Sequence, residues 1–360
     1  MKKVKLICSD LHLGVGKILE GGETNSLEEF YYDEQFAEFL NYYTVGEFKD
    51  TEVELVLNGD IFNFLQIDYN GHYLAVITET ISLENLKGIV KGHPVFFKAL
   101  REFVENGKNS ITFIVGNHDQ GMLWPEVRSY LNQIVGAPIR YKNLVYFFEG
   151  VHIEHGHMHE AANRLDPRRF FLKHNVAEPI LNLPMGSQFF VDFVLKVKLV
   201  NPYIDKVRPF TSFIRWGLVF DTLFTLKTLV GLLFYFGKRI LVPDPRRGQW
   251  SLKNVLKVFA EGAVFPDLDH AARKILNDEK IHTVIFGHSH VYQYRKYGKD
   301  KEYFNTGTWT ELTSLDMVSL GKITKLTYVL IEYPDQADRP RGRLKEWRGF
   351  HRVQKDVDVS

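Results

Sequence analysis

Residues 3–14 read KVKLICSDLHLG, and this stretch decides how the chain folds. Its apolar run, Val4–Cys8, has the length and composition of a buried β-strand. Asp10 and His12 follow where that run ends. Because one residue separates them, their carboxylate and imidazole can reach the same side of the chain and bind one cation. The stretch therefore predicts a strand with a metal site at its end.

Four more polar blocks of the same kind lie far apart along the chain. They are Gly59-Asp60, Gly116-Asn117-His118-Asp119, His155-Gly156 and Gly287-His288-Ser289-His290. All but one close an apolar run typical of a β-strand, and His155 follows a less regular run, Val151–Ile153. Ligands drawn from the ends of separate strands are what a preorganised metal site on an α/β scaffold requires.

The order of apolar runs divides the chain into regions. Strand and helix patterns alternate over the first ~135 residues, which predicts parallel pairing there. Later strands follow one another without helices, which predicts antiparallel pairing. An aromatic-rich stretch interrupts them. We therefore expect a catalytic domain formed by residues 1–156 and 263–335, a helical insertion of residues 157–262, and a basic C-terminal tail of residues 336–360.

Bulk composition excludes several classes of protein. The chain has 360 residues, 45% hydrophobic and 25% charged, with a net charge of +1. Such a balance is globular and creates no global field that attracts nucleic acid. The single cysteine, Cys8, excludes a disulfide framework and a CxxC zinc site. Because the first strand begins at once, no hydrophobic signal region fits before it, and we expect a cytoplasmic protein.

The ligand types predict the chemistry. Carboxylate, imidazole and amide groups without thiolate suit Mn, Fe or Zn at a hydrolytic site. A carboxylate such as Asp60 can bridge two cations. Two cations ~3.5–4 Å apart lower the pKa of a bound water towards ~7, which supplies hydroxide to attack phosphorus.

The five blocks together resemble the calcineurin-like metallophosphoesterase superfamily, whose pattern is DxH, GD, GNH(D/E), H and GHxH. The resemblance implies an α/β fold in which two packed mixed β-sheets are flanked by helices. It also implies two divalent metal ions, with Mn²⁺ expected first and Fe or Zn as alternatives. One ion would take Asp10, His12, Asp60 and His290, and the other would take Asp60, Asn117, His155 and His288. His118 would lie beside the leaving oxygen as general acid or charge stabiliser, with Asp119 orienting its imidazole.

Taken alone, each block also has a purely structural interpretation. Asp10 suits a turn, His155 a satisfied core histidine, and residues 117–119 a plain loop. His157 and His159 follow Gly156 in a second His-x-His arrangement, so one of them could be the ligand instead of His155. We predict substrate contacts for Asn63, His157 and Arg164.

The insertion holds the only clue to the substrate. Residues 216–236 are almost continuously apolar, apart from Asp221 and Lys227. The run approaches the length of a membrane span, but each central charge costs about 2.5–3.5 kcal/mol on the insertion scale. Treated as one helix, it has a polar stripe and a wide apolar face. Three interpretations stay open: a lid or membrane-surface helix, a core or dimer contact, and a true span.

The sequences around two blocks, Asp-Leu-His-Leu-Gly and Gly-Asp-Ile-Phe-Asn-Phe, are similar to those of UDP-2,3-diacylglucosamine pyrophosphatases. That family carries Arg where this chain has His118, and its insertion is shorter. The likeness implies a phosphoester or pyrophosphate of an amphiphilic molecule, such as an acylated sugar nucleotide. The apolar insertion adds the expectation of a peripheral location on the inner face of the membrane. Phosphoprotein phosphatase, nuclease and cyclic-nucleotide phosphodiesterase activities use the same metal chemistry and remain alternatives. A metal-stabilised membrane scaffold without activity is the non-enzyme alternative.

Overall fold

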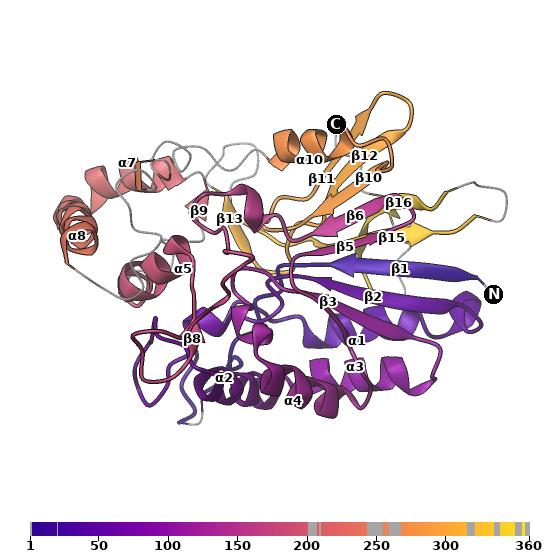
Figure 1. Ribbon diagram of the computed structural model, residues 1–360, viewed down its shortest axis with the longest axis horizontal. Helices are drawn as coiled ribbons and strands as arrows, with labels where there is room; N and C mark the ends of the chain where they lie inside the picture. The colour runs from indigo at the N-terminus through magenta and orange to yellow at the C-terminus, as the bar shows by residue number, and fades with distance from the viewer. Residues whose placement is uncertain are drawn as a thin grey trace.

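Two mixed β-sheets pack face to face at the centre of the molecule, with helices on their outer sides (Figure 1). This computed structural model describes residues 2–19, 21–200, 207–208, 210–242, 255–256, 258, 268–314, 321–334, 339–349 and 355–356. The layer order is helices, first sheet, second sheet, helix. It is the fold that the resemblance implied.

The first sheet contains, in spatial order, β17 (Lys355–Asp356), β16 (Arg341–Trp347), β15 (Leu326–Glu332), β1 (Lys3–Cys8), β2 (Glu52–Asn58), β3 (Ser110–Ile114) and β4 (Arg140–Lys142). β1 to β4 run parallel, as their alternation with helices predicted. β15 and β16 pair antiparallel, so the boundary expected at residue 335 falls between two neighbouring strands of this sheet.

The second sheet contains β11 (Gln293–Tyr297), β12 (Lys301–Asn305), β10 (Thr283–Phe286), β6 (Val151–Glu154) and β5 (Val145–Phe148), in that order. The expected antiparallel pairing is only partly correct, because β10 runs parallel to both β6 and β12. The insertion and α10 (Leu268–Leu276) lie between β6 and β10, and such a long crossover can return the chain to the starting edge of the sheet.

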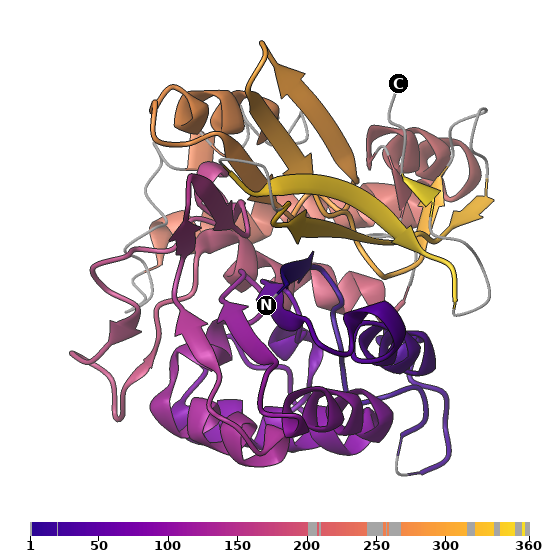
Figure 2. The same ribbon diagram turned by 90° about the vertical axis from the view of Figure 1, so that its right-hand side faces the viewer.

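Helices cover the outer face of the first sheet on one side, as Figure 2 also shows. They are α1 (Asp33–Tyr42), α2 (Glu79–Gly92), α3 (Pro94–Glu105) and α4 (Pro125–Val135). Proline at the first position suits the start of α3 and α4, because its missing N–H has no partner there anyway. Short 3₁₀ turns connect the elements: η1 (Gly46–Phe48), η2 (Phe64–Gln66), η3 (Gln120–Leu123) and η4 (His157–His159).

Three of the hydrophobic clusters among the described residues follow these layers. Phe36, Phe39 and Phe96 belong to a large aromatic cluster between the helices and the first sheet. Ile7 and Ile285 meet in the cluster between the two sheets. A third cluster joins α10 to the second sheet. Because both faces of β1 to β3 are covered, these strands are buried along nearly their whole length.

The insertion contains the pair β7 (Phe171–Leu172) and β8 (Ile180–Leu181), and then a helical segment made of α5 (Met185–Phe189), the π-helical turn η5 (Phe190–Val194) and α6 (Leu195–Lys198). We call residues 185–198 the site helix. β9 (Val207–Arg208) pairs with β13 (Leu312–Ser314), which also pairs with β14 (Gly321–Ile323).

The apolar run at 216–236 forms two helices, α7 (Phe210–Phe220) and α8 (Thr222–Leu241). Asp221 interrupts them at the N-cap position of α8, with φ −144°. The expectation of one continuous helix with one polar stripe is therefore wrong. Among the described residues, no helix has the length and apolar character needed to cross a membrane.

Candidate metal centre

The predicted ligands come together at one rim of the two sheets. Asp10 follows β1, Asp60 follows β2 and Asn117 follows β3, and these three strands are parallel neighbours. His155 follows β6 and His288 follows β10, which are parallel neighbours in the second sheet. Since parallel strands end at a common edge, side chains far apart in sequence become neighbours there.

The glycines of the polar blocks leave space for these ligands. A Cβ atom on Gly59 would lie 2.5 Å from His155 Cγ, and one on Gly287 would lie 2.5 Å from Asp10 Oδ2. One on Gly116 would overlap the Asp60 carboxylate. Real Cβ contacts are essentially never this short. A side chain at any of these glycines would thus displace a predicted ligand that belongs to another block.

The backbone is left-handed at most of the predicted ligands. The φ angles are 55° for Asp10, 54° for His12, 51° for Asp60, 67° for His288 and 60° for His290. Asp, Asn and His are the non-glycine types that tolerate this region best, but it is still costly and is concentrated at functional sites.

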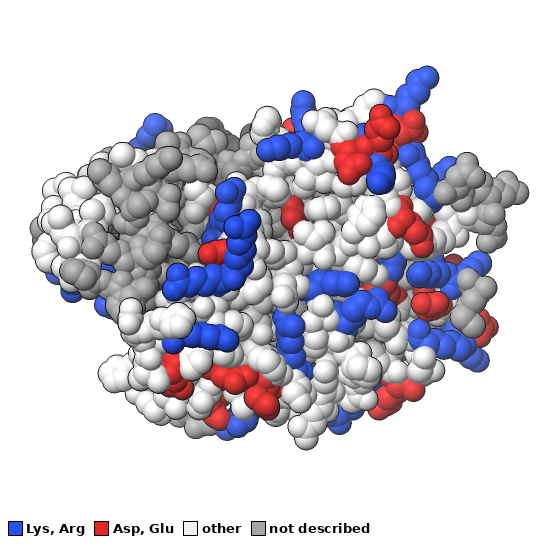
Figure 3. All heavy atoms as spheres, viewed as in Figure 1, with Lys and Arg blue, Asp and Glu red and all other residues white. Residues whose placement is uncertain are grey.

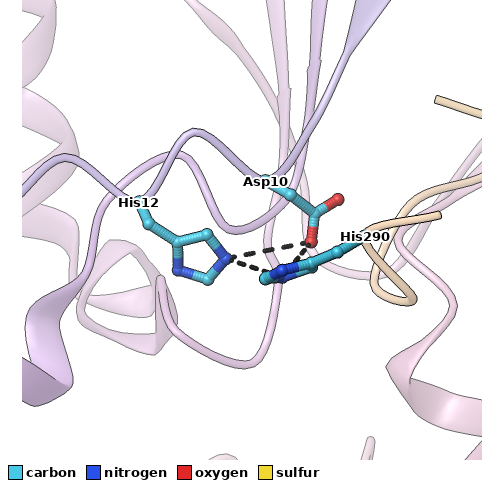
Figure 4. A group of neighbouring side chains, drawn as sticks. All are labelled: Asp10, His12 and His290. Atoms are coloured by element: carbon cyan, nitrogen blue, oxygen red, sulfur yellow. Dashed lines mark hydrogen bonds and ion pairs between the residues drawn. The ribbon is translucent and has the colours of Figure 1, made fainter. Parts of the chain in front are cut away.

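One group of possible ligand atoms contains Asp10, His12 and His290 (Figure 4). The Nε2 atoms of His12 and His290 are 3.1 Å apart, and His290 Nε2 is 3.3 Å from Asp10 Oδ1. The backbone N–H of His288 donates to both oxygens of Asp10 at 3.0 and 3.2 Å, which orients the carboxylate. Burial, together with the imidazoles of His118 and His290, lowers the pKa of His12 to about 3. A neutral imidazole is the form that binds metal.

A second group contains Asp60, His155 and His288. His155 Nε2 lies 3.1 Å from Asp60 Oδ2, and its Nδ1 donates to the Asn58 carbonyl at 2.9 Å. Asp60 Oδ2 is also 3.9 Å from His12 Nε2, which places this carboxylate between the two groups. Burial alone would lower the pKa of His155, but the Asp60 and Asp10 carboxylates raise it to about 10. The arrangement thus favours positive charge at this point.

Buried polar atoms without partners test whether metal ions fit. Among the described residues, Asn117 Oδ1 is buried and accepts no hydrogen bond, and His155 Nε2 makes none although it lies 3.1 Å from Asp60 Oδ2. The backbone carbonyl of Asn117, in contrast, accepts a hydrogen bond from Gln120 Nε2 at 2.8 Å, so the residue is held in place. Leaving such atoms unpaired costs about 1–3 kcal/mol each. Divalent cations would supply the missing partners, and the oxygen and nitrogen donors here suit them.

His118 lies at the same rim, in a third group of possible ligand atoms with His12 and Asp60, but Asp119 does not orient it. The Nδ1–H of His118 donates to Asn63 Oδ1 at 2.9 Å. The Asp119 carboxylate accepts instead from the backbone N–H groups of Asp60, Phe62 and Gly116. The prediction that Asp119 orients the imidazole is therefore wrong: Asp119 holds the Asp60 loop, and Asn63 positions His118. Burial lowers the pKa of His118.

The remaining predicted contacts lie at different depths. His157 is buried, and its ring centroid is 5.4 Å from that of His155 and 6.4 Å from that of His288. Neither of its ring nitrogens has a partner among the described residues. Arg164 Nε donates to the Met158 carbonyl at 2.8 Å. Their contact with substrate stays a prediction.

Sequence reasoning missed several groups at this centre. Glu160 Oε2 is 2.6 Å from His288 Nε2, and Glu29 Oε2 is 4.0 Å from His12 Nδ1. The site helix contributes Phe190, whose ring centroid is 5.7 Å from that of His118, and Lys198, which donates to Glu29 Oε1 at 2.6 Å. These residues lie outside the five blocks, so no spacing in the sequence connects them to the ligands.

Three comparisons relate the chain to known proteins. The sequence profile of the calcineurin-like phosphoesterases matches residues 5–292. No curated protein matches the sequence. Among solved structures, vacuolar protein sorting 29 from Cryptosporidium parvum is similar at 10% identity and a TM-score of 0.34, over 99% of this chain and 96% of that one. A dimetal phosphatase from Danio rerio is similar at 10% identity and a TM-score of 0.36, over 99% of both chains. These structural likenesses are too distant to support an argument about function.

Proposed function

Because the chain belongs to the calcineurin-like phosphoesterase family and is a metal-dependent phosphoester hydrolase, we propose that it acts on an amphiphilic phosphoester or pyrophosphate, such as an acylated sugar nucleotide. Two divalent ions, Mn²⁺ in this proposal, would be held by Asp10, His12, Asp60, Asn117, His155, His288 and His290. The observation that supports this assignment is the convergence of ligand atoms at one rim, with Asp60 between the two groups.

The chain's own residues have separable roles in this reaction. The ions supply Lewis-acid polarisation of a phosphoryl oxygen and a lower pKa for water. The backbone N–H groups bonded to Asp10 and Asp60 hold these carboxylates in place. The bond from His118 Nδ1–H to Asn63 leaves Nε2 as the nitrogen that exchanges a proton with a reacting oxygen. Phe190 packs beside His118 and limits access of water from that side.

The site helix connects the metal centre to the apolar surface of the insertion. On one side it contacts catalytic groups: Ser187 Oγ donates to the Asn117 carbonyl at 3.4 Å, and Lys198 donates to Glu29. On the other side, Phe189 and Phe193 pack against Tyr235 of α8, with ring centroids 5.6 and 5.8 Å apart. A substrate with its phosphate at the metals and its acyl chain towards α8 would contact both the polar metal centre and the apolar side chains of the insertion.

The α7–α8 pair exposes many large apolar side chains. Leu223 is 81% exposed and Phe234 is 74% exposed. The others are Trp216, Leu218, Val219, Phe220, Leu226, Val230, Leu233, Leu241 and Val242. In Figure 3 the far left tip, where α8 lies in Figure 1, shows few charged side chains. Exposed large apolar side chains gathered on one pair of helices are typical of an interaction site.

A membrane surface fits the charges around these helices. The exposed cations Arg215 and Lys238 lie at the two ends of the apolar run and exposed Lys227 lies within it, while Asp221 is the one acidic residue among the described side chains of 215–242. Apolar residues bordered by cations are typical of elements that lie in the interface of anionic bilayers. We therefore propose peripheral attachment through the α7–α8 pair.

Vesicle binding tests the attachment. The double variant Leu223→Glu/Phe234→Glu is expected to lower partition onto phosphatidylglycerol vesicles at least 100-fold, since burying each side chain contributes about 1.5–3 kcal/mol. Phe147→Glu, at a half-exposed aromatic position on β5, is the matched control and should bind as the wild type does. Equal binding by the double variant and the control would contradict attachment through α8.

A substrate panel tests the reaction. We expect kcat/KM to be highest for an acylated sugar nucleotide in detergent and much lower for its deacylated form. Bis-p-nitrophenyl phosphate, a phosphopeptide, a cyclic nucleotide and single-stranded DNA cover the other activities, each with Mn²⁺, Fe²⁺ or Zn²⁺. His288→Ala should abolish every activity. A higher rate on the deacylated molecule, or on one of the other classes, would refute the amphiphilic substrate, and no turnover at all would favour a scaffold role.

A further inference from the structure

Glu160 holds one of the predicted metal ligands from outside the five sequence blocks. Its Oε2 lies 2.6 Å from Nε2 of His288, at the start of the insertion. We infer that Glu160 is a positioning residue that fixes the orientation and the tautomer of His288, and that metal affinity at the Asp60–His155–His288 group depends on it. This inference concerns metal binding and goes beyond the proposed reaction.

The direction of the hydrogen bond determines which nitrogen is left for a metal. An ionised carboxylate only accepts, so Nε2 of His288 carries the proton and Nδ1 keeps its lone pair. His155 has the opposite arrangement, because its Nδ1–H donates to the Asn58 carbonyl and leaves Nε2. Both imidazoles of this group therefore have one nitrogen fixed by a partner and one nitrogen available, which is how metal-binding histidines are usually held.

Glu160 is itself fixed by the insertion. Asn163 Nδ2 donates to the same carboxylate oxygen at 2.6 Å, and the Arg164 backbone N–H donates to the Glu160 carbonyl at 3.0 Å. Asn163 packs against Gly186 of α5 so closely that a Cβ there would overlap its Oδ1. The Gly186 backbone N–H also donates to the Ala162 carbonyl at 2.7 Å. The carboxylate is thus positioned from the site helix as well as from its own turn.

Burial separates this pair from an ordinary surface ion pair. The side chain of His288 is 8% exposed and that of Glu160 is 22% exposed. Exposed ion pairs contribute little, because water screens them and the side chains lose freedom. Here most water is excluded, and a carboxylate acting on the second nitrogen raises the basicity of the ligand. Removing such a partner typically lowers metal affinity by about 10–100-fold.

Metal titration of the chelator-treated protein tests the inference without using activity. We expect calorimetry to find two Mn²⁺ ions bound by the wild type. In Glu160→Ala, one ion should bind about 10–100-fold more weakly while the other is unchanged. Glu160→Gln should fall between the two, since an amide oxygen still accepts from Nε2–H but carries no charge. Asp33→Ala removes another carboxylate bonded to a histidine, His93, and is the matched control.

The tautomer gives a second readout. Long-range ¹H–¹⁵N spectra of the metal-free wild type should show His288 protonated at Nε2. In Glu160→Ala the spectra should show a mixture of the Nε2–H and Nδ1–H tautomers of His288. If Glu160→Ala binds both ions with wild-type affinity and keeps the tautomer, the inference is overturned. If Glu160→Gln loses an ion as completely as His288→Ala does, Glu160 binds the metal directly and the positioning role is wrong. Two-ion binding without hydrolysis of any substrate would refute the proposed function and leave this inference standing.

Discussion

Replacing Gly287 with alanine is expected to damage the metal centre while the protein stays folded. Gly287 lies between β10 and His288, and its φ is outside the left-handed region, so alanine adds volume without backbone strain. The new Cβ would lie 2.5 Å from Asp10 Oδ2 and 2.8 Å from Ser9 Cβ, and closest of all to Ser9 Oγ. Ordinary van der Waals contact begins at 3.4 Å. To regain ordinary contact, Asp10 Oδ2 must therefore move about 0.9 Å away from the new Cβ, which is the difference between 3.4 and 2.5 Å.

A shift of this size is large for a metal ligand. A misplacement of about 1 Å can cost about 100-fold in rate, and that factor corresponds to about 2.7 kcal/mol of transition-state stabilisation. Overpacking a dense region costs typically about 1–3 kcal/mol of stability, which most folded domains survive. We therefore expect kcat/KM to fall about 100-fold and Mn²⁺ to bind more weakly, with a modest fall in melting temperature.

The assay compares hydrolysis of bis-p-nitrophenyl phosphate, Mn²⁺ calorimetry and thermal melting for the same preparations. Gly21→Ala is the matched control, because a Cβ there meets no atom within 4 Å and its φ also lies outside the left-handed region. It should leave all three measurements near wild type. Wild-type activity and metal stoichiometry in Gly287→Ala would refute the steric argument for the block glycines.

Three further predictions follow from other contacts. Burial alone would lower the pKa of His93, but its two carboxylate partners raise it to about 9. This pKa lies above the value of about 6.5 in the unfolded chain, so the pairing of protonated His93 with its carboxylates contributes about 3 kcal/mol to stability below pH 6.5. That contribution is lost as the pH rises towards 9. The melting temperature of the wild type should therefore fall between pH 6.5 and 9, and that of His93→Gln should fall less. His118→Ala should lower kcat by about 100-fold or more with both metals bound, and Asn63→Ala should do so less. Lys198→Met should raise KM and destabilise the protein, because it leaves the Glu29 carboxylate with one hydrogen-bond donor fewer in a largely buried place.

Each of these has an outcome that would contradict it. A melting temperature that rises between pH 6.5 and 9 in wild type, but not in His93→Gln, would reverse the sign assigned to the histidine. Loss of a metal ion in His118→Ala would show that this residue is a ligand and not a proton carrier. The buried pair Lys5–Glu54 is the control for Lys198→Met, since Lys5→Met should destabilise the protein and leave KM unchanged.

The convergence of the predicted ligands could be anticipated because their signal is local. Most of the blocks close an apolar run, as Gly59-Asp60 follows β2, and the parallel order of these strands then brings the side chains together. Glu160 and Glu29 could not be predicted in this way, because their proximity to His288 and His12 depends on how the loops return over the rim.

The errors have identifiable physical causes. Asp119 follows His118 in sequence, but the turn after β3 directs its carboxylate back to backbone N–H groups. In the insertion, hydrophobic periodicity masked the break between α7 and α8. Asp221 followed by Thr222 was an available N-cap signal, since Asp is favoured at that position. The pairing of β10 with β6 depends on a crossover of more than a hundred residues that no local pattern reports.

The left-handed φ angles at Asp10, His12, Asp60, His288 and His290 change how substitutions at this centre should be interpreted. An alanine at one of these positions removes a ligand but keeps the Cβ atom, and with it most of the backbone penalty of about 1–2 kcal/mol that the native side chain already carries. Glycine removes the same ligand and relieves the penalty. For the metal-free chain, glycine in place of one of these ligands is therefore expected to favour folding, so these positions are places where function is kept at a cost in stability.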